Sequence, residues 1–175
     1  LVELGGTAGE YQNVLYYEAS RIMKLRERDT VVHIHVSYLP TPAHVGEPKT
    51  KPTQLSVKQL NAMSIQPDFL VARTEGDLDA RRRDRLALFC NMYPEDVIVN
   101  RDLPSIYQVP LEFAKQEFDK KVLVKLGLED HQSDLTQWES FVKKALAKKT
   151  KQLTIAIVGK YFKTGDYNLK DSYHA

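Results

Sequence analysis

Apolar residues along the chain recur at two spacings, one typical of helices and one typical of strands. Helical spacing or helix-start signals predict helices at residues 15–25, 56–65, 79–90, 110–126 and 134–147. Short apolar or β-branched runs predict strands at residues 1–4, 31–37, 69–72, 97–99 and 153–158. Strands that alternate with helices indicate an α/β fold around a largely parallel sheet.

The pattern also predicts which face of one helix is buried and where a long loop lies. In the helix 79–90, the pattern predicts that Leu86, Leu88 and Phe89 point inward. Four prolines lie between Leu39 and Thr53, so that segment is predicted to be a loop.

The order of elements also suggests a division of the chain. We expect residues 1–128 to form the C-terminal part, roughly the second half, of an α/β domain, and residues 129–152 to form a linker. The strand at 153–158 with its short tail is too small to be a domain, so 153–175 is expected to begin a second one.

Composition narrows the class of protein. The chain has 25 Lys+Arg and 23 Asp+Glu, a net charge of +2, with 42% hydrophobic residues. This composition argues against a disordered chain and provides no charge excess of the kind that nucleic-acid binding uses. The single cysteine, Cys90, excludes an intramolecular disulfide and fits a reducing compartment, so we expect a cytoplasmic protein. No apolar run approaches the roughly 18 residues of a membrane span.

The segment Lys49–Gln54 (KTKPTQ) is the strongest candidate for chemistry. Two lysines and neutral hydroxyl and amide groups stand on a proline-stiffened loop, a donor set suited to a polyphosphate. A solvated basic loop is the alternative. The glycine-rich stretch 5–9 could hold an anion at a helix start or be only a tight turn. Glu3 precedes it at a strand end, either as a Mg²⁺ ligand or as a salt-bridged strand end.

Other charged or reactive residues have structural explanations. The arginine run 81–85 is typical of a solvated helix face, and Cys90 is typical of a small buried residue. His33 and His35 share one side of a strand, but no third ligand stands at metal-site spacing.

Six strings resemble the CTP synthase family in order and approximate spacing: LVELGGTAGE, GEPKTKPTQLSVKQL, QPDFLVART, ALFCN, SIYQVP and TIAIVGKY. The resemblance implies a P-loop amidoligase domain, a linker and the first strand of a class I glutamine amidotransferase domain. It implies a ligase in which ATP phosphorylates UTP and ammonia from glutamine displaces the phosphate to give CTP. It further implies Mg²⁺, activation by GTP, inhibition by CTP and a homotetramer, with neither nucleic acid nor membrane as a partner.

The resemblance also implies roles for individual residues. Glu3 corresponds to a Mg²⁺ ligand, and Arg101, Asp102 and Leu103 hold the adenine of ATP. UTP or CTP contacts are implied for Glu10, Tyr11, Gln12, Lys49, Thr50, Lys51, Pro52, Thr53, Gln54 and Arg85. Two positions depart from the family pattern: the usual GDIE is Gly9–Gln12 (GEYQ) here, and Arg85 replaces a lysine.

No catalytic residue of that family falls within the chain. The Walker A loop and the glutaminase triad have no counterpart in residues 1–175, so we expect an internal fragment that is inactive alone. Two other functions stay open at this point. One is a short non-catalytic nucleotide-binding or regulatory module, and the other is a basic nucleic-acid-binding module.

Overall fold

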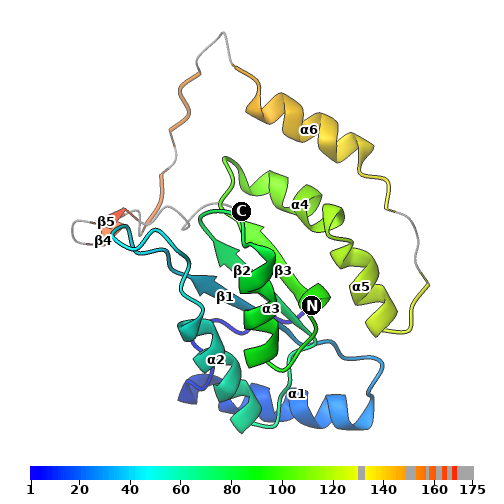
Figure 1. Cartoon of the computed structure of the whole chain (residues 1–175). Coiled ribbons are helices and arrows are strands. Elements are labelled where there is room, and N and C mark those ends of the chain that lie inside the picture. The colour runs from blue at the N-terminus through cyan, green and yellow to red at the C-terminus, as the bar shows by residue number, and fades with distance from the viewer. Residues whose placement is uncertain (130–132, 149–152, 157, 161–162, 165–166, 169–175) are drawn as a thin grey trace.

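A parallel sheet of three strands forms the centre of the molecule. The computed structural model describes residues 1–129, 133–148, 153–156, 158–160, 163–164 and 167–168. Strands β1 (Ile34–Leu39), β2 (Phe69–Thr74) and β3 (Val97–Arg101) pair in the order β1-β2-β3, all parallel (Figure 1). The predicted α/β class with a parallel sheet is therefore confirmed.

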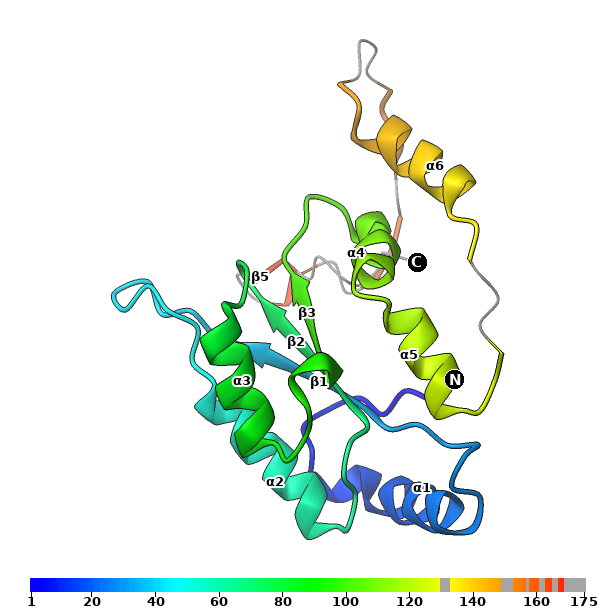
Figure 2. The ribbon, with the colours of Figure 1, turned by 45° about the vertical axis from the view of Figure 1, so that its right-hand side comes forward.

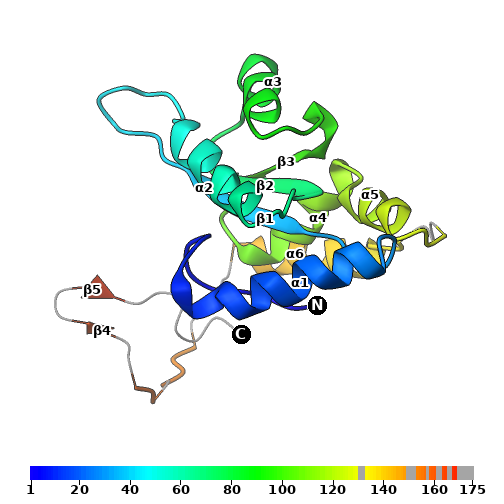
Figure 3. The same ribbon diagram turned by 90° about the horizontal axis from the view of Figure 1, so that it is seen from below.

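Helices cover both faces of this sheet (Figures 2 and 3). Helices α2 (Lys51–Ala62) and α3 (Ala80–Phe89) connect the strands and lie on one face. Helices α4 (Val109–Lys115) and α5 (Phe118–Lys125) lie on the other. The first face is packed by Leu39, Val57, Leu70, Ala72, Leu78, Leu86, Ala87, Cys90 and Val97. The second is packed by Phe69, Val71, Ile98 and Phe118.

Helix α1 (Val14–Arg26) follows a short 3₁₀ turn, η1 (Tyr11–Asn13), and is joined to the strand starts by polar contacts. Lys24 Nζ lies 3.1 Å from Asp68 Oδ2, and the Asp68 carboxylate also accepts the backbone N–H of His33. The predicted helix at 15–25 is confirmed.

Two predicted elements differ from the structure at their ends. Helix α2 begins at Lys51 rather than Ser56, because Pro52 in its first turn has the φ value that a helix start needs. The predicted helix 110–126 is broken into α4 and α5 at Glu117, which has a φ of 54°. The break lets the Gln116 side-chain amide bond the backbone N–H and C=O of Val99 in the edge strand β3.

The predicted strand at 1–4 does not form. Leu1 and Val2 are exposed, and no neighbouring strand supplies hydrogen bonds to this segment in the described part of the chain. Residues 153–156 and 158 also lie outside any strand, while residue 157 is not among those described. Strand pairing depends on a partner, which a short apolar run does not reveal.

The inward face of α3 was only partly predicted. Leu86 is fully buried, as expected, but the side chains of Leu88 and Phe89 are 77% and 49% exposed. Leu86, Ala87 and Cys90 make the buried face, at the i, i+1 and i+4 spacing of one helix side, and leave positions 88 and 89 facing outward.

Helix α6 (Thr136–Leu146) lies beyond this core and confirms the last predicted helix. Its Trp138 donates an indole N–H to the backbone oxygen of Tyr107, in the 3₁₀ turn η3 (Ile106–Gln108), at 2.8 Å. Phe141 adds an edge-to-face contact with the Tyr107 ring. The remaining elements are short: η2 (Pro94–Asp96) and the antiparallel pair β4 (Lys163–Thr164) and β5 (Tyr167–Asn168).

We expect His35 to make the stability of this core dependent on pH. The ring lies between β1 and α2, hydrogen-bonded to Ser56 Oγ at 2.8 Å, and burial lowers its pKa below the ordinary 6.5. A lowered folded-state pKa means that the unfolded chain binds the proton more readily, so stability falls as pH drops below about 6.5. We expect His35→Gln to lose less stability than the wild type between pH 7.5 and 5.5, measured by urea unfolding. An equal loss in both proteins would contradict this role.

Candidate functional site

The loop between β1 and α2 brings Lys49 to the start of α2. The Lys49 backbone N–H donates to the oxygen of Pro40 at 2.9 Å, which closes the loop 40–50 across its base. The Lys49 side chain is partly exposed and reaches Glu47, with Nζ 2.6 Å from Oε1. The loop therefore presents a partly exposed lysine whose ammonium has a carboxylate partner.

The segment Lys49–Gln54 divides into an outward part and an inward part. Lys51 and Pro52 are exposed in the first turn of α2. Thr53 is fully buried, with its hydroxyl 2.8 Å from Ser37 Oγ in β1, and Gln54 is buried with its amide donating to Thr50 Oγ1. Lys49, Thr50 and Lys51 thus form the accessible set, while Thr53 joins the helix start to β1 and Gln54 joins it to Thr50.

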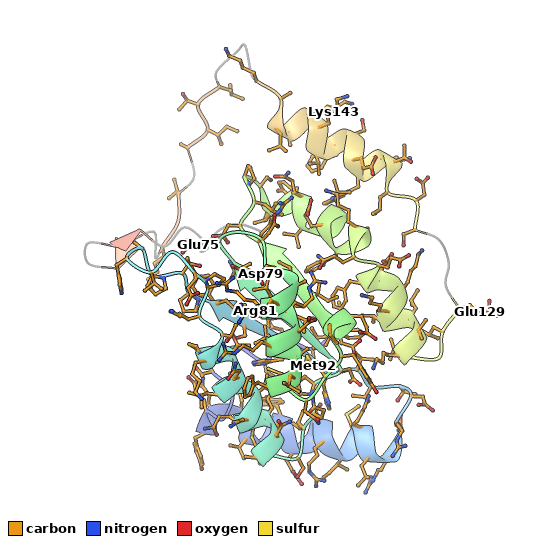
Figure 4. The ribbon with its side chains drawn as sticks, viewed as in Figure 1. Glu75, Asp79, Arg81, Met92, Glu129 and Lys143 are labelled. Carbon is orange, nitrogen blue, oxygen red and sulfur yellow. The ribbon has the colours of Figure 1, made fainter. Side chains whose placement is uncertain are left out.

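The N-terminus of α3, where Figure 4 labels Asp79 and Arg81, contacts the same loop through an ion pair. Arg82 donates to Glu47 Oε2 at 2.8 Å and also pairs with Asp79, whose carboxylate caps the helix. Both cations lower the pKa of the Glu47 carboxyl, the Lys49 hydrogen bond being the larger cause. Arg85 is exposed one turn further along α3, over the Phe89 ring. The structure therefore links the loop that bears Lys49 to the helix that bears Arg85.

The arginine run 81–85 is partly explained by these contacts. Arg82 forms ion pairs with the helix cap Asp79 and with Glu47 of the loop. Arg81 is exposed in the first turn of α3 (Figure 4). Such a run needs no nucleic acid to account for it.

The N-terminal segment folds into a turn rather than a strand end. Gly6 has a φ of 85°, and a Cβ there would meet Glu10 Oε2. The Gln12 amide donates to the same carboxylate at 2.9 Å, so Glu10 and Gln12 are held together. Gly9, with a φ of 91°, lies against Gln59 of α2.

Glu3 is exposed in the N-terminal segment. No hydrogen bond or ion pair among the described residues joins Glu3 to Lys49 or Lys51. The structure thus leaves the Glu3 carboxylate available but does not bring it into contact with the lysine-bearing segment.

The carboxyl end of β3 borders a cavity of about 320 Å³. Arg101 lies at its edge, with its guanidinium 3.3 Å from Asp77 and 3.4 Å from Glu112. The Asp102 N–H donates to the oxygen of Thr74, which prolongs the pairing of β2 and β3. The cavity is lined by Asp77, Leu78, Arg83, Val99, Arg101, Glu112, Lys115 and Gln116. Ligands of parallel sheets bind at this edge.

Sequence reasoning missed a polar row across the same end of the sheet. Tyr38, Arg73 and Asn100 occupy matching register positions on the three strands. Asn100 Oδ1 is buried and has no hydrogen-bond partner among the described residues, which is costly unless a ligand or water supplies one. These residues are far apart in sequence, and only the strand register reveals that they form a row.

The described residues contain no group of three or more His, Cys, Asp or Glu side chains placed to hold a metal ion. His33 and His35 have partners on different helices, Ser20 in α1 and Ser56 in α2. Burial raises the pKa of the Cys90 thiol to about 11, so it is a poor nucleophile at neutral pH. Within the described part of the chain, no helix is long and apolar enough to cross a membrane.

This arrangement suits an anionic, extended ligand. Lys49, Lys51 and Arg85 supply positive charge, Thr50 supplies a hydroxyl, and the start of α2 contributes the positive end of its dipole. A second polar region lies at the ends of β2 and β3, around the cavity and Asn100. Phosphate binding is the chemistry that these donors share.

A family model and individual relatives both show that this chain is similar to CTP synthases. A family model described as CTP synthase N-terminus matches residues 1–128. The chain is 44% identical over 174 residues to the CTP synthase of Caldanaerobacter subterraneus subsp. tengcongensis and 45% identical to that of Pyrococcus furiosus. Each alignment covers 99% of this chain and 31% of the relative. The chain therefore spans about a third of the length of these relatives.

Proposed function

This chain belongs to the CTP synthase family, and from that premise we propose that it supplies the pyrimidine-nucleotide contacts of a CTP synthase. The complete protein would be a ligase that forms a C–N bond. ATP phosphorylates UTP at the uracil O4, and ammonia from glutamine displaces the phosphate to give CTP.

The observation that carries this proposal is the segment Lys49–Gln54 at the start of α2. Its outward residues Lys49, Thr50 and Lys51 offer charge-assisted and neutral donors to the triphosphate of UTP or CTP. Arg85 adds a further cation on α3. We assign Glu10, Tyr11, Gln12 and Pro52 to the same nucleotide, and Thr53 and Gln54 support it by fixing the helix start.

We assign ATP to the second polar region. Arg101, Asp102 and Leu103 leave the sheet beside the cavity at the carboxyl end of β3, where an adenine has room. The resemblance adds Mg²⁺, for which Glu3 is an exposed carboxylate without a partner among the described residues. One such oxygen ligand fits Mg²⁺, which takes one or two carboxylates together with substrate phosphates and would neutralise phosphate charge there.

The remaining proposals concern the complete protein. We propose that residues 1–128 belong to its amidoligase domain, 129–152 to a linker and 153–175 to the start of a glutamine amidotransferase domain. GTP would activate glutamine hydrolysis, CTP would inhibit by competing with UTP, and the active form would be a cytoplasmic homotetramer. Residues 1–175 alone would be inactive.

The experiment is an assay of CTP formation by the complete protein that carries this sequence. We expect product only when UTP, ATP, Mg²⁺ and either ammonia or glutamine are all present, with inhibition by added CTP that UTP overcomes. Nucleotide binding without any product would instead favour a non-catalytic regulatory module.

A further inference from the structure

The carboxylate of Glu47 connects two segments that are distant in sequence. Oε1 lies 2.6 Å from Lys49 Nζ in its own loop, and Oε2 lies 2.8 Å from Arg82 Nη2 on α3. Each carboxylate oxygen therefore binds one cation. Arg82 is itself anchored, because its second ion pair is with Asp79, the residue that caps α3.

The loop 40–50 needs such an anchor. Its internal hydrogen bonds run from the N–H groups of Val45 and Gly46 to Pro42, and from Lys49 to Pro40. These bonds shape the loop without reaching α3; at the end of the loop, Thr50 is joined to α2 through Gln54, which donates its backbone N–H and its side-chain amide to Thr50. Among side-chain hydrogen bonds within the described residues, the one from Arg82 to Glu47 joins this loop to α3.

This link has a consequence for ligand binding. Lys49 belongs to the loop and Arg85 lies one turn beyond Arg82 on α3, so both cations are held relative to each other through Glu47. We propose that Glu47 is a positioning residue for the pyrimidine-nucleotide site. It holds Lys49 and the loop against α3 so that the two cation-bearing segments meet the triphosphate together. This inference rests on the proposed function.

Glu47 has two opposing influences on nucleotide binding: its charge repels the phosphates, and its contacts order the cations. Glu47 adds a negative charge near the phosphates, but it is partly exposed, and water and salt weaken that repulsion. Lys49 uses one of its three N–H donors on Glu47, which leaves two for the ligand. Because the loop and two long side chains are ordered beforehand, nucleotide binding loses less conformational freedom. The gain in affinity from holding Lys49 and the loop in place is therefore expected to exceed the loss from repulsion between Glu47 and the phosphates.

The same contacts contribute little to folding. All three side chains are more than a third exposed, at 45% for Glu47, 41% for Lys49 and 35% for Arg82. Ion pairs of that exposure contribute little to stability. A variant at Glu47 is thus expected to fold normally, which separates an effect on binding from an effect on folding.

The test compares Glu47→Gln, Glu47→Asp and Arg82→Gln in the complete protein, with Asp84→Asn as a control. Asp84 is an exposed acid on α3 with no described partner. We expect Glu47→Gln to raise the KM for UTP and the inhibitory concentration of CTP about three- to tenfold, with a smaller change in kcat and none in the KM for ATP. Glu47→Asp keeps the charge and should lie closer to the wild type. Adding Arg82→Gln to Glu47→Gln should raise the KM for UTP little further, because the first substitution already breaks the ion pair between the two residues.

Each alternative outcome has a distinct meaning. A lower KM for UTP in Glu47→Gln would show that the carboxylate competes with phosphate and would overturn the inference. An unchanged KM there, with a raised KM in Lys51→Ala, would overturn the inference and leave the proposed function standing. Unchanged values in both variants would overturn the proposed function as well.

Discussion

Replacing Glu3 by Ala is expected to abolish Mg²⁺-dependent CTP formation in the complete protein while glutamine hydrolysis continues. Glu3 is exposed, and no partner in the described residues would keep it from a metal ion. A metal ion contributes several kcal/mol to phosphoryl transfer, so its loss lowers the rate by at least about a hundredfold. The two activities are measured separately, as CTP formed with ammonia and as glutamate released from glutamine.

Asp29→Ala is the matched control for Glu3→Ala. Asp29 is an exposed acid in the turn after α1, so its removal changes the net charge equally without touching the proposed site. CTP formation at the wild-type rate in Glu3→Ala would refute the assignment of this carboxylate to Mg²⁺.

Lys51→Ala is expected to weaken the binding of UTP and CTP together. Lys51 is exposed in the first turn of α2 and has no described protein partner, so the substitution removes a ligand contact and little else. Each charge-assisted hydrogen bond contributes about 1.5–3 kcal/mol, which corresponds to roughly a ten- to hundredfold rise in Kd. Titration calorimetry with each nucleotide measures this change.

Lys58→Ala is the control for this experiment. Lys58 is exposed on the same side of α2, about two turns further along. Its replacement by Ala removes one positive charge, as Lys51→Ala does. Equal losses in the two variants would point to general electrostatic attraction. An unchanged affinity in Lys51→Ala would remove Lys51 from the site.

The parallel sheet was predictable because its strands are short apolar or β-branched runs. Phe69, Leu70 and Val71 are buried on both faces of β2, so a continuous apolar run marks the strand without any alternation. The run Leu1–Leu4 has a similar composition but no neighbouring strand in the described part of the chain. Pairing is a tertiary property, and composition therefore predicted this element wrongly.

The sequence marked the segment of the candidate site, but it did not show which of its residues face solvent and which face the core. The lysines and prolines of Lys49–Gln54 marked the segment, but the early start of α2 turns Thr53 and Gln54 into the core. Glu47 stands two residues before Lys49, yet its contact with Arg82 spans 35 positions and has no local signal. Asn100 is likewise explained only by the register of the sheet.

The most direct test of the central claim is a crystal structure of the complete protein with UTP and Mg²⁺. We predict that the triphosphate oxygens lie within about 3.2 Å of the Lys49 and Lys51 ammonium groups. A triphosphate bound elsewhere, with both lysines facing solvent, would contradict the account.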